Sequence, residues 1–231
     1  MPGALANYKH LLLLAALLVA LVTQPLAAGE HVIARTAYDL FLGGVLVVML
    51  FVVFEARWER WTATVLALPA MALTVALNMA APQLTVPAAV AYHISLAAFI
   101  GFAVAVIVRD IFRHRAISFD EIVGAFAGYL LLGIMWGSLY VLVELFAPGS
   151  FAVSPDIRWQ LDDVHLRRAL FNYLSFATMA SLGYNDITAV APVANTLTWL
   201  EVMTSQFYLA VVIAQLVGIK LMHMVSGPGA R

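Results

Sequence analysis

The sequence TMASLGYND, residues 178–186, interrupts an otherwise apolar half of the chain with polar residues and glycine. An apolar run with helical character, residues 170–180, leads into it and should end at Gly183, because glycine readily adopts backbone conformations that stop a helix. A polar turn follows, and Pro192 then opens another long apolar run. We therefore expect the chain to enter an apolar phase here, turn, and return to the side from which it came.

Composition predicts an integral membrane protein. Of the 231 residues, 64% are hydrophobic and 11% are charged, whereas soluble domains have about half apolar and a quarter charged residues. The formal net charge of −1 gives no basic surface for nucleic acid, so no nucleic-acid partner is expected. The chain has no cysteine and no pair of histidines at the spacing of a helical metal site. Thiol chemistry is excluded, and we expect neither a protein metal centre nor an organic cofactor.

Six apolar runs are long enough to cross a bilayer, which needs about 20 residues of helix. They cover residues 10–28, 37–54, 62–80, 88–108, 122–146 and 196–222. The predicted fold class is an all-α integral membrane protein with six transmembrane helices. For the first run a cleaved signal peptide is the alternative, because Lys9 precedes it and small residues end it.

Basic residues give the expected orientation, because Lys and Arg concentrate in loops that stay in the cytoplasm. With six spans, one side holds Lys9, Arg57, Arg60, Arg109, Arg113, Arg115, Lys220 and Arg231. The other side holds Arg35, Arg158, Arg167 and Arg168. We expect a multi-pass protein of a cell inner membrane or plasma membrane, with both termini in the cytoplasm.

Residues 1–117 are predicted to form a four-helix scaffold that does not sense voltage. A voltage-sensing helix carries Arg at every third position, but residues 90–108 contain no Arg and a single histidine, His93. With residues 1–117 as a scaffold, we expect the functional features in residues 118–231.

The second unit, residues 118–231, contains a helix that is too short to span. After an exposed loop at 148–161, Asp162 or Asp163 can cap a helix of about four or five turns, shorter than a bilayer requires. Lipid does not tolerate the non-helical backbone that follows, so this backbone must be enclosed by protein or line water. The prediction is a re-entrant helix between the fifth and sixth spans.

The last run carries a polar stripe. Glu201, Ser205 and Tyr208 share one helical face, and Gln206 lies beside it. Polar side chains at membrane depth usually face a bundle interior or a water-filled path. We expect these four residues to line an inner cavity or gate, with hydrogen bonding between helices of one subunit as the alternative.

Residues 118–224 resemble the pore region of the potassium channel superfamily, in particular its small six-span bacterial members without voltage sensors. The resemblance rests on FNYLSFAT at 171–178, then Gly183-Tyr184, Asp186-Ile187-Thr188 and Pro192. It implies a homotetramer in which four loops form a filter whose carbonyls replace the water around K⁺. The filter residues would be Ser181, Leu182, Gly183, Tyr184 and Asn185. Thr178 and Asp186 would support the filter.

The chemistry of the residues agrees with this resemblance. A ring of consecutive carbonyls needs alternating backbone handedness, which Gly183 permits because it lacks a Cβ. The negative C-terminal end of the short helix favours a cation beyond it. Three residues depart from the family pattern: Ser181 replaces threonine, Leu182 replaces valine, and Asn185 replaces the second glycine. Asn is the non-glycine residue that best tolerates a left-handed backbone.

The expected function is a passive, potassium-selective or potassium-preferring tetrameric channel that performs no covalent chemistry and is not an enzyme. Its partners would be K⁺ ions, the bilayer and three further copies of the chain. A weakly selective cation channel is the first alternative, because of Asn185. A non-conducting subunit or a transporter is another. An intramembrane aspartyl protease is a remote one, with Asp39 and Asp186 as its two carboxylates.

Overall fold

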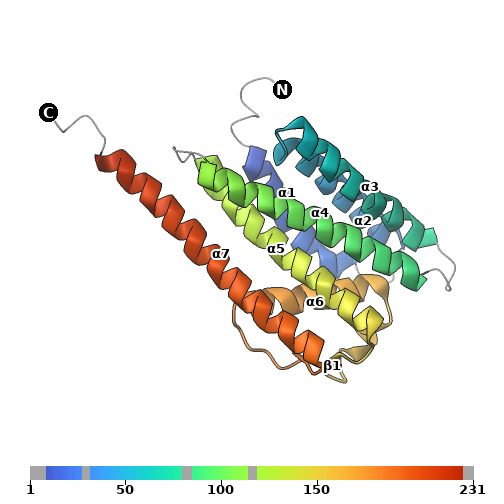
Figure 1. The fold of residues 1–231 in the computed structure, drawn as a ribbon. Helices are drawn as coiled ribbons and strands as arrows, with labels where there is room; N and C mark the ends of the chain where they lie inside the picture. The colour runs from blue at the N-terminus through green and yellow to red at the C-terminus, as the bar shows by residue number, and fades with distance from the viewer. Residues whose placement is uncertain (1–8, 28–31, 80–84, 114–118, 226–231) are drawn as a thin grey trace.

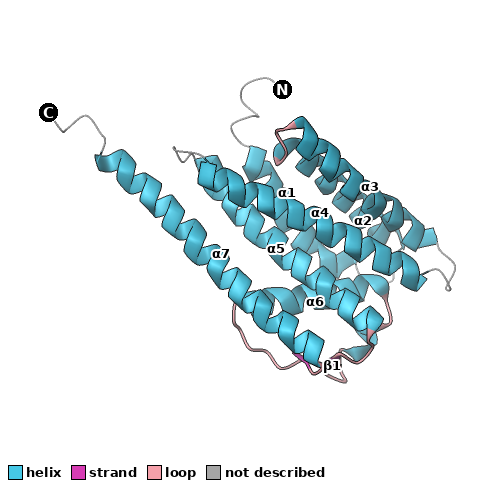
Figure 2. Ribbon diagram, in the orientation of Figure 1, coloured by secondary structure: helices cyan, strands magenta, loops and turns pink. Residues whose placement is uncertain are grey.

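The computed structural model describes residues 9–27, 32–79, 85–113 and 119–225, and the chain in these ranges is almost entirely helical (Figure 2). The long helices are α1 (Lys9–Ala27), α2 (Val32–Val52), α3 (Arg57–Met79), α4 (Thr85–Arg113), α5 (Phe119–Phe146), α6 (Val164–Met179) and α7 (Pro192–Val225). A short 3₁₀ turn, Arg158–Leu161, precedes α6. The all-α prediction is confirmed, and each of the six apolar runs coincides with a helix.

Four helices are long and apolar enough to cross a membrane. Within the described ranges these are Ala34–Val52, Val86–Arg113, Phe119–Phe146 and Pro192–Gln215. The apolar part of α1, Lys9–Gln24, is shorter, and α3 opens with three charged residues, Arg57, Glu59 and Arg60. These helices agree with the membrane protein that the composition predicts.

Ionic contacts gather several helix ends at one end of the bundle. Lys9 Nζ lies 2.8 Å from Glu55 Oε1, joining the start of α1 to the α2–α3 turn. His10 Nδ1 lies 2.7 Å from Asp120 Oδ2 at the start of α5. Arg109, near the end of α4, pairs with Glu59. The grouping of basic residues expected from the sequence thus appears at this end, while residues 1–8, 114–118 and 226–231 lie outside the described ranges.

The α5 helix is the centre of the bundle. It packs against α4 on one side and α6 on another, and α1 also contacts it (Figure 1). Its small residues allow the approach of α6: a Cβ on Gly133 would meet the Phe176 ring, and a Cβ on Gly137 would meet Asn172. Glycines at such positions let helices pack closely inside a membrane protein. The position of α6 therefore depends on α5.

At the other end of the bundle, α6 lies between α5 and α7 (Figure 1). Its 16 residues correspond to about 24 Å of helix, less than the roughly 30 Å of a bilayer core. Two short strands, β1 (Phe151–Val153) and β2 (Ile187–Ala189), flank it and pair antiparallel, with Ala152 opposite Thr188. The sequence analysis did not predict this pairing, which ties the loop before α6 to the segment after it.

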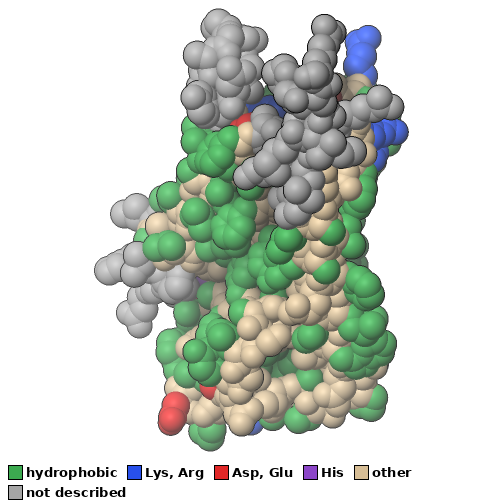
Figure 3. Space-filling model, turned by 90° about the vertical axis from the view of Figure 1, so that its left-hand side faces the viewer, with side chains coloured by type: hydrophobic (Ala, Val, Ile, Leu, Met, Phe, Trp, Pro, Cys, Tyr) green, Lys and Arg blue, Asp and Glu red, His purple; other side chains and the backbone are tan. Residues whose placement is uncertain are grey.

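The α7 helix has 34 residues and leans away from the rest of the molecule (Figure 1). Only 17% of its apolar stretch is buried, compared with 61% of that in α5. Seen from the α7 side, hydrophobic side chains extend over much of the visible face (Figure 3). Trp199, Met203 and Phe207, spaced by four residues, are each about half exposed or more. An apolar helical face is therefore uncovered by the chain itself.

Candidate functional site

The candidate site begins where α6 ends. The Ser181 amide donates to the Thr178 carbonyl and the Leu182 amide donates to the Ala177 carbonyl, both at 2.9 Å. This pair of bonds is the Schellman arrangement, which requires a left-handed residue just after the helix. That residue is Ser181, with φ of 55°, the one described non-glycine residue with positive φ. The helix thus ends at Met179, four residues before Gly183 and earlier than the sequence predicted.

Gly183 is the second left-handed residue of the segment, with φ of 68°. Ser181 and Gly183 thus alternate with Leu182, which agrees with the alternating handedness expected around the glycine. Asn185 was expected to tolerate a left-handed backbone, but it does not have positive φ. The non-glycine left-handed position is Ser181, because the helix cap imposes it.

The segment from Ala180 to Asn185 is exposed on the single chain. Leu182 is 54% exposed and Tyr184 is 56% exposed, although both carry large apolar surfaces. Hydrogen bonds and strand pairing hold the two sides of the segment, since the Ser154 amide donates to the Asp186 carbonyl at 2.8 Å. Its middle projects beyond these anchors.

Asp186 follows the exposed segment and acts on Tyr173, one residue of a stacked tyrosine pair. Its Oδ1 accepts from the Ile187 amide at 3.2 Å. Tyr173 on α6 stacks on Tyr184 at 6.2 Å between ring centres, with 13° between the ring planes. Burial, together with the nearby Asp186 carboxylate, raises the pKa of the Tyr173 hydroxyl to about 12. The sequence analysis missed Tyr173, although the aromatic residue of FNY was a visible signal.

A groove between α6, the exposed segment and α7 brings together several predicted site residues. Thr178, Ser181, Gly183 and Tyr184 line it, whereas Leu182 and Asn185 do not. The remaining lining residues are Leu174, Ala177, Ile187, Thr188, Ala189, Asn195, Thr198 and Val202. Thr178 therefore lines the same groove as three residues of the segment that it was expected to support.

The polar stripe of α7 faces its own subunit. Glu201 is fully buried and accepts hydrogen bonds from the hydroxyls of Tyr140 on α5 and Ser175 on α6. The Tyr208 hydroxyl donates to the Ala125 carbonyl of α5 at 2.7 Å. Ser205 is buried and donates to its own helix at the Val202 carbonyl. Glu201 and Tyr208 thus bond to neighbouring helices of the same subunit, as in the alternative, whereas Ser205 bonds within α7.

Gln206 differs from the other three residues of the predicted gate. It is exposed, on a part of α7 that the chain does not cover. Among the four, it is the residue whose side chain is exposed on the single chain.

A charged cluster at the start of α6 was not predicted from the sequence. Arg168, expected in an outer loop, is buried on α6. Its Nη2 lies 3.3 Å from Asp39 Oδ1 on α2, and its Nη1 donates to the Tyr92 hydroxyl of α4 at 3.1 Å. The Tyr38 ring lies 5.2 Å from the guanidinium carbon. The cluster forms only when three segments that are distant in the sequence come together. No local spacing of residues therefore predicts it.

Asp163, one of the two residues predicted to cap α6, is the residue that caps it. Its Oδ1 accepts from the amides of His165 and Leu166 at 2.8 and 3.0 Å, and its Oδ2 lies 2.9 Å from Arg35 Nη2. Burial alone would raise the pKa of Asp163, but the two amides and Arg35 lower it below its usual value. The start of α6 is thus fixed by charge.

The two carboxylates of the protease alternative have different surroundings. Asp39 belongs to the Arg168 cluster, and Asp186 lies beside Tyr173 at the exposed segment. In the part of the chain that is described, no group of three His, Asp or Glu residues is placed to hold a metal ion.

No protein-family model, no curated protein and no solved structure matches the chain.

Proposed function

We propose that the chain is one subunit of a passive homotetrameric channel, selective for K⁺ or preferring it, in a cell inner membrane or plasma membrane. Six spans with cytoplasmic termini would carry the pore unit, residues 118–231. The observation that best supports this proposal is the path of the chain between α5 and α7. There a helix too short to span leads into non-helical backbone with left-handed residues at Ser181 and Gly183.

The physical argument concerns backbone groups at membrane depth. Unpaired carbonyls and amides cost several kcal/mol each in hydrocarbon, roughly the value of an unmade hydrogen bond there, so they must face protein or water. A loop of this kind between two apolar helices is therefore expected to line a water-filled path. Consecutive carbonyls of residues 181–185 would replace the hydration shell of an ion in that path.

The α6 helix favours a cation at the same place. Its C-terminal end, at Met179, is directed into the exposed segment, and the aligned peptide dipoles make that end negative. The groups behind the filter would be Thr178 in the groove and Asp186 beside Tyr173. Gln206 would line the inner cavity, while Glu201 and Tyr208 would hold α7 to α5 and α6.

Two exposed surfaces support several chains around one axis. Leu182 and Tyr184 protrude from the segment, and α7 presents Trp199 and Phe207 to the outside. Each chain would supply one quarter of a closed ring, and closed cyclic symmetry is the usual solution for soluble and membrane oligomers alike. Neighbouring copies would then enclose the backbone that the single chain leaves open.

The test is a measurement of reversal potential with purified protein in planar bilayers. A K⁺-selective pore predicts a shift of about 59 mV per tenfold K⁺ gradient, as for any single charge at equilibrium. Cross-linking or native mass determination should give four chains. Absence of ion flux from a protein that is monomeric or dimeric in the bilayer would overturn the proposal.

A weakly selective cation channel is the second candidate, and Asn185 is the residue that favours it. The family pattern has glycine there, and a side chain restricts how the outermost carbonyl can point. In this case K⁺ and Na⁺ would permeate about equally, and Asn185→Gly should raise the preference for K⁺. Unchanged selectivity in a strongly K⁺-selective protein would remove this candidate.

A further inference from the structure

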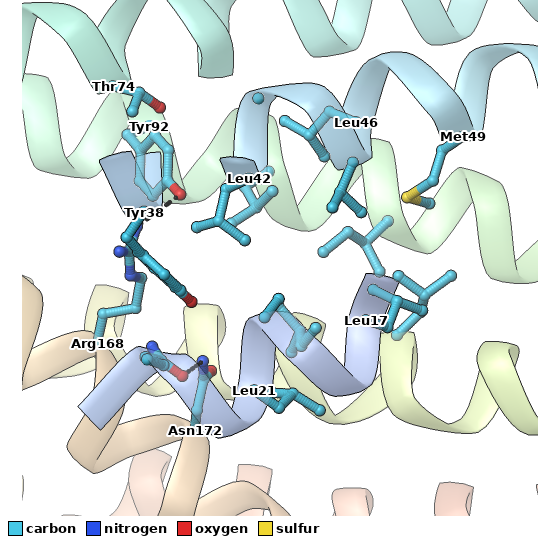
Figure 4. A pocket seen from close by; sticks show the side chains of 18 residues that line it. Leu17, Leu21, Tyr38, Leu42, Leu46, Met49, Thr74, Tyr92, Arg168 and Asn172 are labelled. Carbon is cyan, nitrogen blue, oxygen red and sulfur yellow. Dashed lines mark hydrogen bonds between the residues drawn. The ribbon is translucent and has the colours of Figure 1, made fainter. Parts of the chain in front are cut away.

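Two buried ionisable side chains help to fix α6, and their surroundings differ. Near the start of the helix, Arg168 pairs with Asp39 and donates to the Tyr92 hydroxyl. Arg168 and Tyr92 lie at the polar end of a cavity of about 50 Å³ among six helices, where Tyr38 and Asn172 add further polar groups (Figure 4). The positive charge of Arg168 thus has a carboxylate partner inside the bundle.

Glu201 on α7 is the second of these side chains, and it has no such partner. It is fully buried, and the groups that act on its carboxyl are the hydroxyls of Tyr140 and Ser175. Besides Tyr140, the titratable side chain that Glu201 influences is Tyr129 on α5. Among the described residues no cation neutralises Glu201. An ionised carboxylate is costly to bury without one, above all at membrane depth.

The contacts of Glu201 need one more proton than the two hydroxyls supply. Ser175 Oγ lies 2.8 Å from the Gly133 carbonyl of α5 and also contacts Glu201 Oε1. The Tyr140 hydroxyl contacts Glu201 Oε2. A carbonyl only accepts hydrogen bonds, and so does an ionised carboxylate. With an ionised Glu201, three contacts between oxygens would share two protons, and one pair of oxygens would meet without a proton.

We propose that Glu201 is a neutral carboxylic acid whose own proton makes the third hydrogen bond. Oε1 then donates to Ser175 Oγ, which reverses the direction that this bond has with an ionised carboxylate. Ser175 donates to the Gly133 carbonyl, and Tyr140 donates to Oε2. Each of the three contacts holds one proton, and the hydrogen bonds connect α7 to both α6 and α5.

The proton makes Glu201 a positioning residue for α6 and α7. Glu201 acts on α6 through Ser175 and on α5 through Tyr140, and Thr178 at the end of α6 also acts on the Tyr140 hydroxyl. Under the proposed channel function, on which this step alone rests, the same proton would hold the helix before the filter to the helix beside the inner cavity. The neutral state of Glu201 does not depend on conduction.

Infrared difference spectroscopy on the full-length protein in detergent micelles tests for the proton. A protonated carboxyl group has a carbonyl stretching band above the amide bands, and an ionised carboxylate lacks this band. At pH 6 a glutamate with the ordinary pKa of about 4.3 is ionised. We expect the band in the wild-type protein at this pH and its loss in Glu201→Gln.

Two further variants control this measurement. Glu144 is partly exposed and its carboxylate accepts from the Gly149 amide at 2.7 Å, so Glu144→Gln should leave the band unchanged. Ser175→Ala should shift the band without removing it, because the acid loses its acceptor. The proposal is wrong if Glu201→Gln removes no such band, or if Ser175→Ala leaves its frequency unchanged.

The pH dependence of unfolding gives an independent test, because glutamine mimics the neutral acid. Its amide can donate to Ser175 and its oxygen can accept from Tyr140. An unfolded chain has Glu201 ionised above about pH 4.3, so folding takes up one proton in the wild type and none in Glu201→Gln. The wild-type unfolding constant, divided by that of the variant, should therefore rise by up to about tenfold per pH unit.

Unfolding in mixed micelles between pH 5 and pH 7 measures this ratio. We expect it to increase at least tenfold over the two units, with wild type becoming the less stable protein relative to Glu201→Gln as the pH rises. A constant ratio would overturn the proposal, because an ionised Glu201 takes up no proton on folding. Neither measurement involves ion flux, so a failure here is distinct from a failure of the channel proposal.

Discussion

The two ends of α6 have opposite surroundings. At its start, Asp163 and Arg168 are tied by charge to α2, α4 and Arg35, and Arg168 is buried by the chain's own helices. At its other end, Ser181 and Gly183 lead into a segment that is exposed and anchored only at its sides. One chain completes the first environment and leaves the second open.

In the proposed tetramer, this difference separates contacts within one subunit from contacts between subunits. A buried charge that is paired within one subunit belongs to the folding of that subunit. Exposed left-handed backbone beside an uncovered apolar helix is what the proposed tetramer would enclose, since such backbone at membrane depth must face protein or water. The variants below change either end of α6 and should separate these two roles.

The largest effect is expected at the buried end. Arg168→Met leaves Asp39 without its guanidinium partner inside the bundle, which should lower the free energy of unfolding by about 3–5 kcal/mol. Lys9→Met breaks the exposed pair with Glu55 and should cost less than about 1 kcal/mol. Unfolding by denaturant in mixed micelles measures both. Equal losses would mean that the Arg168 pair has no more weight than a surface contact.

Glu201 connects the middle of α6 to α7. Replacing it should give the next largest decrease in the free energy of unfolding. Glu201→Leu leaves the buried Tyr140 hydroxyl without its acceptor, at about 1–3 kcal/mol of unfolding free energy. Thr204→Leu, on the exposed side of α7, is the control and should change stability little. The same unfolding assay compares the stability of the two variants. A Glu201→Leu protein as stable as the parent would show that the hydrogen bonds of Glu201 are not needed to hold α7.

At the open end, Gly183→Ala should change ion flux more than stability. A Cβ at this φ costs about 1–2 kcal/mol, which turns the adjoining carbonyls away and lowers K⁺ flux by at least about tenfold. Gly149→Ala puts a similar strain at φ of 85°, in the α5–β1 turn, without touching the segment. Flux into proteoliposomes should fall only in Gly183→Ala. Equal flux in the two variants would detach residues 181–185 from conduction.

The smallest effect is expected from acid at the α6 cap. Because the folded state lowers the pKa of Asp163 below 3.8, the ionised carboxylate stabilises the fold above that pH, and this contribution is lost as the pH falls further. Asp163→Asn keeps the cap but removes the charge, so its unfolding free energy should lose about 0.3–1 kcal/mol at neutral pH. The two proteins should then converge below pH 3.8. A constant difference across this range would contradict the assignment.

Several features followed from sequence alone because they depend on local pattern. Long apolar runs predicted the helices, and the shortness of the run before Gly183 predicted α6. Asp163 was one of two named caps because a carboxylate at a helix start has a local partner, the helix's own amides. The pairing of β1 with β2 was missed, since three-residue strands have too short a pattern to stand out from loops.

The position of a polar side chain around a helix was harder to predict than its presence. Glu201, Ser205 and Tyr208 were correctly placed on one face, yet that face points to α5 and α6 because Tyr140, Ser175 and the Ala125 carbonyl satisfy it. Helical spacing fixes which residues share a face but not what lies opposite.

Sequence by itself determined that the chain is apolar and helical, that it contains one short helix before a glycine, and which residues follow that helix. Tertiary structure alone decided that Arg168 meets Asp39 and Tyr92, that Ser181 and not Asn185 is left-handed, and that a cavity with a polar end lies among six helices. The reason is physical: hydropathy and propensity act over one or two turns. Buried charge pairs and cavities instead arise between residues more than 50 positions apart.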